Sequence, residues 1–228
     1  MQIVVTGASR GIGLELVRQY LERGDAVVAA CRAPQEAVGL QGLSAAHPES
    51  LRVLPCDVSD DASVQSFGKS LNGLGVDLLI NNAGVGDWAG LDTMSMEVAL
   101  RVYSINALGP LRVTRALLPA LRGGQGRRVV HISSGMGSIS DNSSGGAYAY
   151  RMSKAALNMA SKCLSLDLAD DKIISVVINP GWVKTDMGGS GASITALESV
   201  TAMVARFDTL TLAHSGSFLN WRGGEYAW

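Results

Sequence analysis

Residues 6–13 read Thr-Gly-Ala-Ser-Arg-Gly-Ile-Gly, and this octet decides the fold of the 228-residue chain. It follows a short apolar run, Gln2–Thr6, and precedes Gly13–Arg23, where apolar side chains recur every three to four residues. This order predicts a buried strand, a glycine-rich turn and a helix. Glycines permit a tight turn and close approach of the backbone to a ligand, and free N–H groups at a helix start bind a pyrophosphate. The spacing TGxxxGxG differs from the commoner GxGxxG, and by itself the octet also fits a turn that binds nothing.

Strand and helix patterns alternate along most of the chain. The strand candidates are apolar throughout, as in strands buried on both faces: Gln2–Thr6, Ala26–Cys31, Leu51–Pro55, Asp77–Asn81, Arg128–Ser133 and Ile173–Asn179. The helix candidates are Gly13–Arg23, Asp60–Leu71, Met96–Leu121 and Tyr148–Leu168, with a weaker pattern, interrupted by glycines, over Pro34–His47. The alternation predicts a single α/β domain over residues 1–228, a doubly wound parallel sheet with helices on both faces. Such sheets bind ligands at the carboxyl ends of their strands.

The composition excludes several classes of protein. Hydrophobic residues make up 47% of the chain and charged residues 17%, which is too apolar for a disordered protein. The formal net charge is −1 and no Lys/Arg cluster is present, so we expect no nucleic-acid partner. The apolar stretches have strand length and no signal peptide precedes the first strand, so we expect a cytoplasmic protein with no membrane partner. Three widely spaced cysteines and three histidines suit neither a disulfide framework nor a metal site, and we expect no metal.

A second motif lies at the start of the helix candidate Tyr148–Leu168. Tyr150 and Lys154 are four residues apart, which places the phenol and the ammonium one turn apart on the same helix face. A phenol has a pKa near ~10, and an adjacent lysine cation together with an oxidised nicotinamide would lower it toward neutrality. Tyr–Lys pairs are common on helices, but joined to the glycine-rich turn this one indicates acid–base chemistry beside a bound dinucleotide.

Together, these motifs resemble the short-chain dehydrogenase/reductase family over nearly the whole chain. Four further segments fall where that family has them: Asn81–Gly84, Asn106, Ile132–Ser134 and Asn179–Thr185. Within the family, Ser134–Ile139 and Gly223–Trp228 are most similar to C-factor and sniffer-like carbonyl reductases. The resemblance implies a Rossmann-type fold in which residues 1–100 form mainly the dinucleotide-binding half, and residues 101–228 the catalytic and substrate half.

The resemblance also implies a role for each catalytic residue. Tyr150 would give or take the hydroxyl proton, and Ser134 would hydrogen-bond the carbonyl oxygen where charge develops. Lys154 would lower the pKa of Tyr150 and hold the ribose hydroxyls. Asn106 would kink its helix and hold a water of the proton relay.

The serine assignment leaves an alternative open. Ser133 and Ser134 point to opposite faces if the strand continues through them, so only one can face the site. Tyr150 follows Ser134 by 16 positions, a few more than is usual in the family, and the excess lies in the polar insert Ser140–Gly146. The position of the strand end favours Ser134.

We expect NADP(H) to be favoured over NAD(H). An NAD-preferring site has Asp or Glu near the end of the second strand, whereas this strand ends at Cys31 and Arg32 follows. Arg32, Ser9 and Arg10 are placed to meet a 2′-phosphate; the alternative is that both arginines are simply solvated. By the resemblance, Asp57 reads the adenine amino group. The expected cofactor contacts are Thr6, Gly7, Ser9, Arg10, Gly11, Ile12, Gly13, Arg32, Asp57, Val58, Asn82, Ala83, Gly84, Tyr150, Lys154, Pro180, Gly181, Val183 and Thr185.

The predicted function is NADPH-dependent hydride transfer between the nicotinamide and a small-molecule carbonyl or alcohol. The alternative is a C-factor-like signalling or regulatory protein that binds the dinucleotide without turnover as its main role; an intact Ser134, Tyr150 and Lys154 argues against pure binding. We also expect self-association, as a homodimer or homotetramer, through Met96–Leu121 and Tyr148–Leu168.

Overall fold

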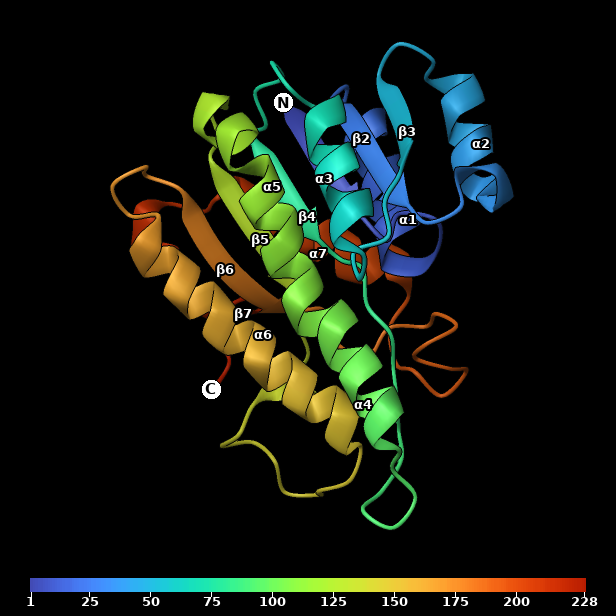
Figure 1. Cartoon of the computed structure of the whole chain (residues 1–228), viewed down its shortest axis with the longest axis vertical. Coiled ribbons are helices and arrows are strands. Elements are labelled where there is room, and N and C mark those ends of the chain that lie inside the picture. The colour runs from blue at the N-terminus through green and yellow to red at the C-terminus, as the bar shows by residue number, and fades with distance from the viewer.

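The strand that precedes the glycine-rich turn lies inside a seven-stranded, wholly parallel sheet (Figure 1). The computed structural model describes residues 1–228. The strand order is β3-β2-β1-β4-β5-β6-β7, so the winding direction reverses between β1 and β4, and a ligand crevice is expected there. The strands are β1 Gln2–Thr6, β2 Ala26–Cys31, β3 Leu51–Pro55, β4 Leu78–Asn81, β5 Arg128–Ile132, β6 Ile174–Asn179 and β7 Phe218–Asn220.

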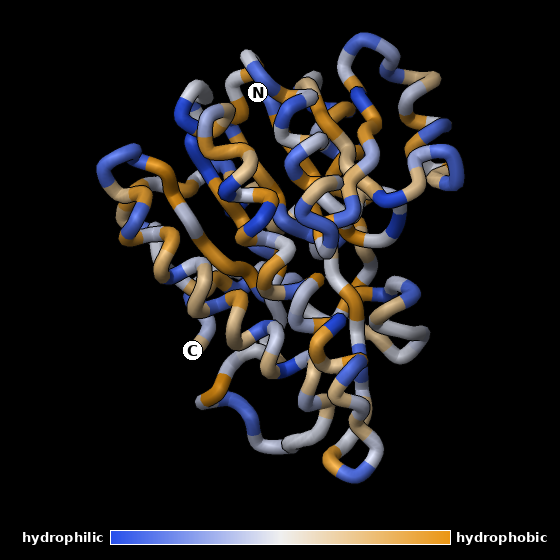
Figure 2. The backbone as a smooth tube through the Cα atoms, in the orientation of Figure 1, coloured by the Kyte–Doolittle hydropathy of each residue, from blue (hydrophilic) through white to orange (hydrophobic).

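Helices cover both faces of the sheet because successive strand residues point to opposite sides. Ile3 and Val5 of β1 pack in the cluster with α1 (Gly11–Glu22), α2 (Val38–Ala46) and α7 (Ala196–Asp208). Val4, between them, packs in the cluster with α3 (Asp61–Ser70) and α5 (Gly109–Gly123). The helix α6 (Tyr148–Asp167) packs beside α5 on this second face, and α4 (Met96–Tyr103) lies at its end (Figure 1). The apolar strands are thus enclosed, whereas the outer turns are largely hydrophilic (Figure 2).

The doubly wound sheet expected from the sequence is confirmed. Each of the six predicted strands begins and ends within one residue of its expected position. The weak helical pattern at Pro34–His47 is a short 3-10 turn, Pro34–Glu36, followed by α2. The sequence analysis did not predict α7 or the three-residue edge strand β7.

The predicted helix Met96–Leu121 is helical throughout but not uniform, and its irregularity falls at Asn106, where the resemblance implies a kink. The segment is divided into α4 and α5 by a π-helical turn, Ser104–Leu108. Proline has no N–H, so Pro110 cannot donate to the carbonyl of Asn106, four residues earlier, and the α-helical ladder is interrupted there. Arg112 donates to the Ser104 carbonyl at 3.0 Å and braces the turn.

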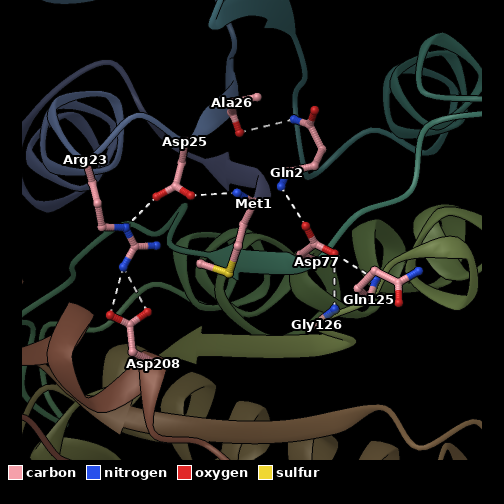
Figure 3. Close-up of polar contacts among 9 residues, drawn as sticks. All are labelled: Met1, Gln2, Arg23, Asp25, Ala26, Asp77, Gln125, Gly126 and Asp208. Carbon is pink, nitrogen blue, oxygen red and sulfur yellow. Dashed lines mark hydrogen bonds and ion pairs between the residues drawn. The ribbon is translucent and has the colours of Figure 1, made fainter.

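The amino ends of the strands are held by two carboxylates (Figure 3). Asp25 accepts from the Met1 ammonium at 2.7 Å and also pairs with Arg23. Asp77 accepts from three backbone N–H groups, those of Gln2 at 2.8 Å, Gln125 at 2.7 Å and Gly126 at 3.1 Å. These contacts join the starts of β1, β4 and β5, at the edge opposite to the carboxyl ends where the site lies.

None of the helices combines the length and the apolar character needed to cross a membrane. The three cysteines are free, and no cluster of three or more His, Cys, Asp or Glu side chains is arranged to hold a metal ion.

Candidate active site

A cavity of about 1150 Å³ opens at the carboxyl ends of the strands. Its walls come from the turns after β1 to β6, the start of α6 and the segment after β7. The segments 88–95, 138–147 and 186–195 extend beyond this edge of the sheet (Figure 1). The sequence-predicted residues that line the cavity are Gly7, Ser9, Arg10, Gly11, Ile12, Gly13, Arg32, Asp57, Val58, Asn82, Ala83, Gly84, Ser134, Tyr150, Lys154, Pro180, Gly181, Val183 and Thr185. Two others, Thr6 and Asn106, lie behind the wall.

The glycine-rich turn forms one end of the cavity and is too tight for other residues. Gly7 has φ +63°, and a Cβ there would lie 2.6 Å from the Cα of Ala83. A Cβ on Gly13 would lie 2.3 Å from the carbonyl oxygen of Gly7. No side chain caps the start of α1, so its first N–H groups are left for a ligand. The turn therefore has the geometry that a pyrophosphate requires.

Thr6 and Asn82 brace this turn from behind. The Asn82 Nδ2 donates to the carbonyls of Thr6 and Gly7, both at 3.0 Å. The Thr6 Oγ1 accepts from the backbone N–H groups of Asn82 at 3.1 Å and Ala83 at 3.2 Å. The side chain of Thr6 is buried, so in this structure it supports the turn rather than lining the cavity.

The charged groups expected at a 2′-phosphate come from the glycine-rich turn and from the segments after β2 and β3. Arg32 follows β2 and is exposed, whereas Arg10 pairs with Asp186 at 2.7 Å across the mouth of the cavity. Asp57 accepts from the N–H and hydroxyl of Ser59. Partial burial opposes ionisation of Asp57, but these hydrogen bonds and the charge of Arg32 lower its pKa. A bound phosphate would find the guanidinium of Arg32 unpaired, whereas it would compete with the Asp186 carboxylate for Arg10.

Tyr150 and Lys154 form the floor of the cavity from the first two turns of α6. The Lys154 Nζ donates to the carbonyl of Ile132, at the end of β5, at 2.8 Å and lies 5.7 Å from the centre of the Tyr150 ring. Both side chains are buried. Burial disfavours the charged form of each group, so it lowers the pKa of Lys154 to about 8 and raises that of Tyr150. The protein groups alone therefore do not produce the lowered phenol pKa that the sequence led us to expect from Lys154.

The two candidate serines differ in how their hydroxyls are used. Ser133 is buried, and its hydroxyl donates to Asn158 Oδ1 at 2.6 Å. The Ser134 Oγ accepts from the N–H of Met136 at 3.1 Å, which leaves its own proton free. The Ser134 hydroxyl beside the phenol offsets part of the rise in the pKa of Tyr150 that burial causes. Ser134 is thus the hydroxyl available to donate to a bound carbonyl oxygen.

Asn106 is fully buried in the π-helical turn. Its Oδ1 accepts from the N–H of Val85 at 2.9 Å, and its Nδ2 donates to the Val85 carbonyl at 2.9 Å and to Ser153 at 3.0 Å. The side chain therefore ties the segment after β4 to α6. The main-chain carbonyl of Asn106, to which Pro110 cannot donate, is a further acceptor available to a water.

The substrate end of the cavity contains residues that sequence analysis did not assign to the site. Trp88 lies 5.0 Å from Tyr150, between ring centres, as one wall. Asp141 from the polar insert and Tyr226 from the carboxyl-terminal segment form another, joined by a hydrogen bond of 2.8 Å. Asp141 and Tyr226 are 85 positions apart, so no local pattern could reveal the pair.

Comparisons with known proteins agree with this geometry. The family model "short chain dehydrogenase" matches residues 1–193. C-signal of Myxococcus xanthus is 53% identical over 154 residues, which are 67% of this chain and 93% of that protein. An NADPH-bound carbonyl reductase from chicken fatty liver superposes with a TM-score of 0.94 at 39% identity, covering 100% of this chain and 94% of the other. The carbonyl reductase Sniffer of D. melanogaster gives a TM-score of 0.95 at 33% identity, covering 100% and 99%.

Proposed function

The chain belongs to the short-chain dehydrogenase/reductase family of oxidoreductases, and from that premise we propose that it reduces ketones or aldehydes with NADPH, or catalyses the reverse reaction. The observation that carries the proposal is the convergence of Ser134, Tyr150 and Lys154 on one cavity with the glycine-rich turn. The likeness to an NADPH-bound carbonyl reductase supports the same reaction class.

The residues of the turn fit a dinucleotide, which supplies the hydride when bound. Its pyrophosphate would lie on the uncapped start of α1, over Gly11 and Ile12. Thr185, whose side chain lies against Gly11, would contact the nicotinamide end. Asp57 would face the adenine, and Arg32 the 2′-phosphate of the adenosine ribose.

Each polar side chain on the cavity floor has a separate task. Tyr150 donates its phenol proton to the carbonyl oxygen during reduction and removes it in the reverse direction. Ser134 donates a hydrogen bond to the same oxygen, where negative charge develops. Lys154 holds the ribose hydroxyls and stabilises the phenolate of Tyr150 electrostatically. Asn106 is a positioning residue that fixes Val85 and Ser153 around them.

The test is NADPH consumption with a panel of reactive diketones and aldehydes. Tyr150→Phe should reduce turnover by ~10²- to 10⁴-fold, the usual contribution of a general acid, and leave NADPH affinity within a few-fold. Tyr148→Phe is the matched control, because Tyr148 begins the same helix but does not line the cavity. Full activity in Tyr150→Phe with loss in Tyr148→Phe would contradict the assignment.

A second candidate function is a signalling or regulatory protein that binds the dinucleotide. The 53% identity to C-signal favours it. Turnover separates the two: a protein that binds NADPH tightly but consumes none with any carbonyl in the panel would favour the regulatory role.

A further inference from the structure

The polar pair at the substrate end, Tyr226 and Asp141, has no part in the proton transfer proposed above. The Tyr226 hydroxyl donates to Asp141 Oδ2 at 2.8 Å, and both residues line the cavity. The same hydroxyl lies against Gly135, where an added Cβ would approach it to 2.6 Å. Only one residue therefore separates the pair from Ser134, the serine that faces the carbonyl oxygen.

Contacts outside the cavity hold the pair in place. The Tyr226 ring packs on Phe218 of β7 with ring centres 5.0 Å apart, and the Asp141 N–H donates to Ser138 at 3.2 Å. The carbonyl of Trp228 accepts from the backbone of residues 139 and 140 at 3.0 and 2.9 Å. The polar insert and the carboxyl-terminal segment thus brace each other, and the pair is a built part of the wall.

The pair offers hydrogen-bond acceptors only. The single proton of Tyr226 is directed to Asp141, which leaves lone pairs on the phenol oxygen, and a carboxylate has no donor. The hydrogen bond to Asp141 and burial raise the pKa of Tyr226, so the phenol stays protonated at neutral pH. Ser134 and Tyr150 present the opposite character, since each donates a hydroxyl proton. The cavity therefore has hydrogen-bond donors, Ser134 and Tyr150, where the substrate carbonyl would bind. It has acceptors, Tyr226 and Asp141, one residue away.

The nearby cation is already engaged. Arg151 lines the cavity, but its Nε donates to the carbonyl of Gly145 at 3.1 Å and its Nη2 to the hydroxyl of Ser144 at 2.8 Å. Its Nη1 donates to the carbonyl of Met136 at 3.5 Å, so each of its three nitrogens already has an acceptor in the protein. Asp141 makes no ion pair, and its Oδ1 has no hydrogen-bond partner in the chain.

We propose that Tyr226 and Asp141 select carbonyl substrates that bear a hydrogen-bond donor, a hydroxyl or an ammonium, on the carbon next to the carbonyl group. A carboxylate at that place would be repelled by Asp141. The aromatic face of Trp88 would contact the apolar body of the substrate. The inference rests on the proposed function, because it takes Ser134 and Tyr150 to bind the carbonyl oxygen.

A series of phenyl ketones that differ only beside the carbonyl tests the proposal. The compounds are α-hydroxyacetophenone, α-methoxyacetophenone and phenylglyoxylate, and kcat/KM is measured for each with NADPH. The hydroxyl compound should exceed its methyl ether by about three- to tenfold, the value of one net hydrogen bond. Phenylglyoxylate should be slower than the hydroxyl compound by about tenfold or more because its charge meets Asp141.

Two variants connect the preference to the pair. Asp141→Asn should raise kcat/KM for phenylglyoxylate by about tenfold. Tyr226→Phe should lower the ratio of kcat/KM between the hydroxyl compound and its ether, because one of the two acceptors is lost. Asp92→Asn, an equal change of charge on an exposed loop outside the cavity, should change neither ratio. Thermal unfolding of each variant identifies any loss that comes from misfolding.

Binding gives a readout that does not depend on turnover. Calorimetric Kd values of the three ketones for the protein–NADP⁺ complex should follow the same order as kcat/KM. Equal Kd values, a wild-type preference for phenylglyoxylate, or unchanged ratios in Asp141→Asn would overturn the inference. Failure of every ketone to consume NADPH would contradict the proposed function, and the order of Kd values would still decide the inference.

Discussion

Lys154 is buried, and burial disfavours the charged form of its ammonium group. Burial lowers its pKa to about 8, whereas an unfolded lysine has a pKa near ~10.4. Between these values the unfolded chain binds a proton that the native protein does not, so wild-type stability should rise with pH in this window. At pH 7 the buried charge costs roughly 3 kcal/mol, and the hydrogen bond to Ile132 returns about 1 kcal/mol.

Lys154→Met should therefore unfold at higher urea concentration than wild type at pH 7, while turnover is lost. The gain should be roughly 1 to 2 kcal/mol and should shrink at pH 9.5, where wild-type Lys154 is largely neutral. Urea titrations of both proteins at the two pH values measure the difference. A variant that is less stable than wild type by the same amount at both would show that burial of Lys154 is not costly.

The choice of cofactor is also decided at single residues. Cys31 stands where an NAD-preferring site has an acid, and the exposed Arg32 follows it. Arg32→Ala should weaken the binding of NADPH by ~10- to 100-fold and change the binding of NADH little, because one charge-assisted hydrogen bond is worth ~1.5–3 kcal/mol. Arg10→Ala should cost less, since Asp186 already pairs with Arg10.

The matched test is the dissociation constant of each cofactor for wild type, Arg32→Ala, Arg10→Ala and Cys31→Asp. The new aspartate should repel the phosphate and move the preference toward NADH. Equal affinity of wild type for both cofactors, or an equal loss of both in Arg32→Ala, would contradict this account of the pocket.

At the scale of the elements, the features that could be predicted from the sequence are those set by residues close together in the chain. The turn after β1 depends on Gly7 and Gly13, six residues apart, and Tyr150 and Lys154 share one helix turn. Short-range signals were still missed. The Thr195–Glu198 capping box marks the start of α7, and Pro110 marks the break between α4 and α5. In contrast, the Tyr226–Asp141 pair depends on tertiary packing that no local pattern encodes.

The amino ends of β1, β4 and β5 depend on Asp77, whose two oxygens accept three backbone N–H groups (Figure 3). Partial burial opposes ionisation, but these hydrogen bonds lower the pKa of Asp77. Its contribution is present above the unfolded value near ~3.9 and is lost as pH falls through the folded value. Asp77→Asn places an NH₂ against a backbone N–H and should cost ~1–3 kcal/mol at pH 7.

Urea midpoints for wild type and Asp77→Asn at pH 7 and pH 3 measure this contribution. The difference in stability between the two proteins should be clear at pH 7 and smaller at pH 3, below the unfolded value, where Asp77 of the unfolded chain is largely protonated. A gap of the same size at both pH values would mean that the carboxylate charge contributes nothing at this junction. Asp92→Asn, the same change at an exposed acid on a loop, is the control.

At the scale of the whole molecule, one surface is more apolar than a monomer requires. Met152, Met159 and Leu166 are exposed at seven-residue spacing along α6. Met96, Leu100 and Tyr103 continue an exposed stripe along α4, which packs against α6. Large exposed apolar side chains gathered on two neighbouring helices are typical of interaction surfaces. An isologous contact would pair the stripe with the same stripe of a second copy about a two-fold axis.

We therefore expect a dimer, with a mass in light scattering of twice the 23.8 kDa of one chain at micromolar concentration. Met159→Glu places a charge in the middle of the α6 stripe on every copy, and burying that charge without a partner would cost several kcal/mol per interface. The variant should sediment and scatter as a monomer, and its thermal unfolding should no longer depend on protein concentration. Val38→Glu introduces the same charge at a more exposed apolar residue, on α2 and away from α4 and α6, and should leave the dimer intact. A wild-type mass of 23.8 kDa, or dissociation by Val38→Glu as well, would exclude this surface as the site of association.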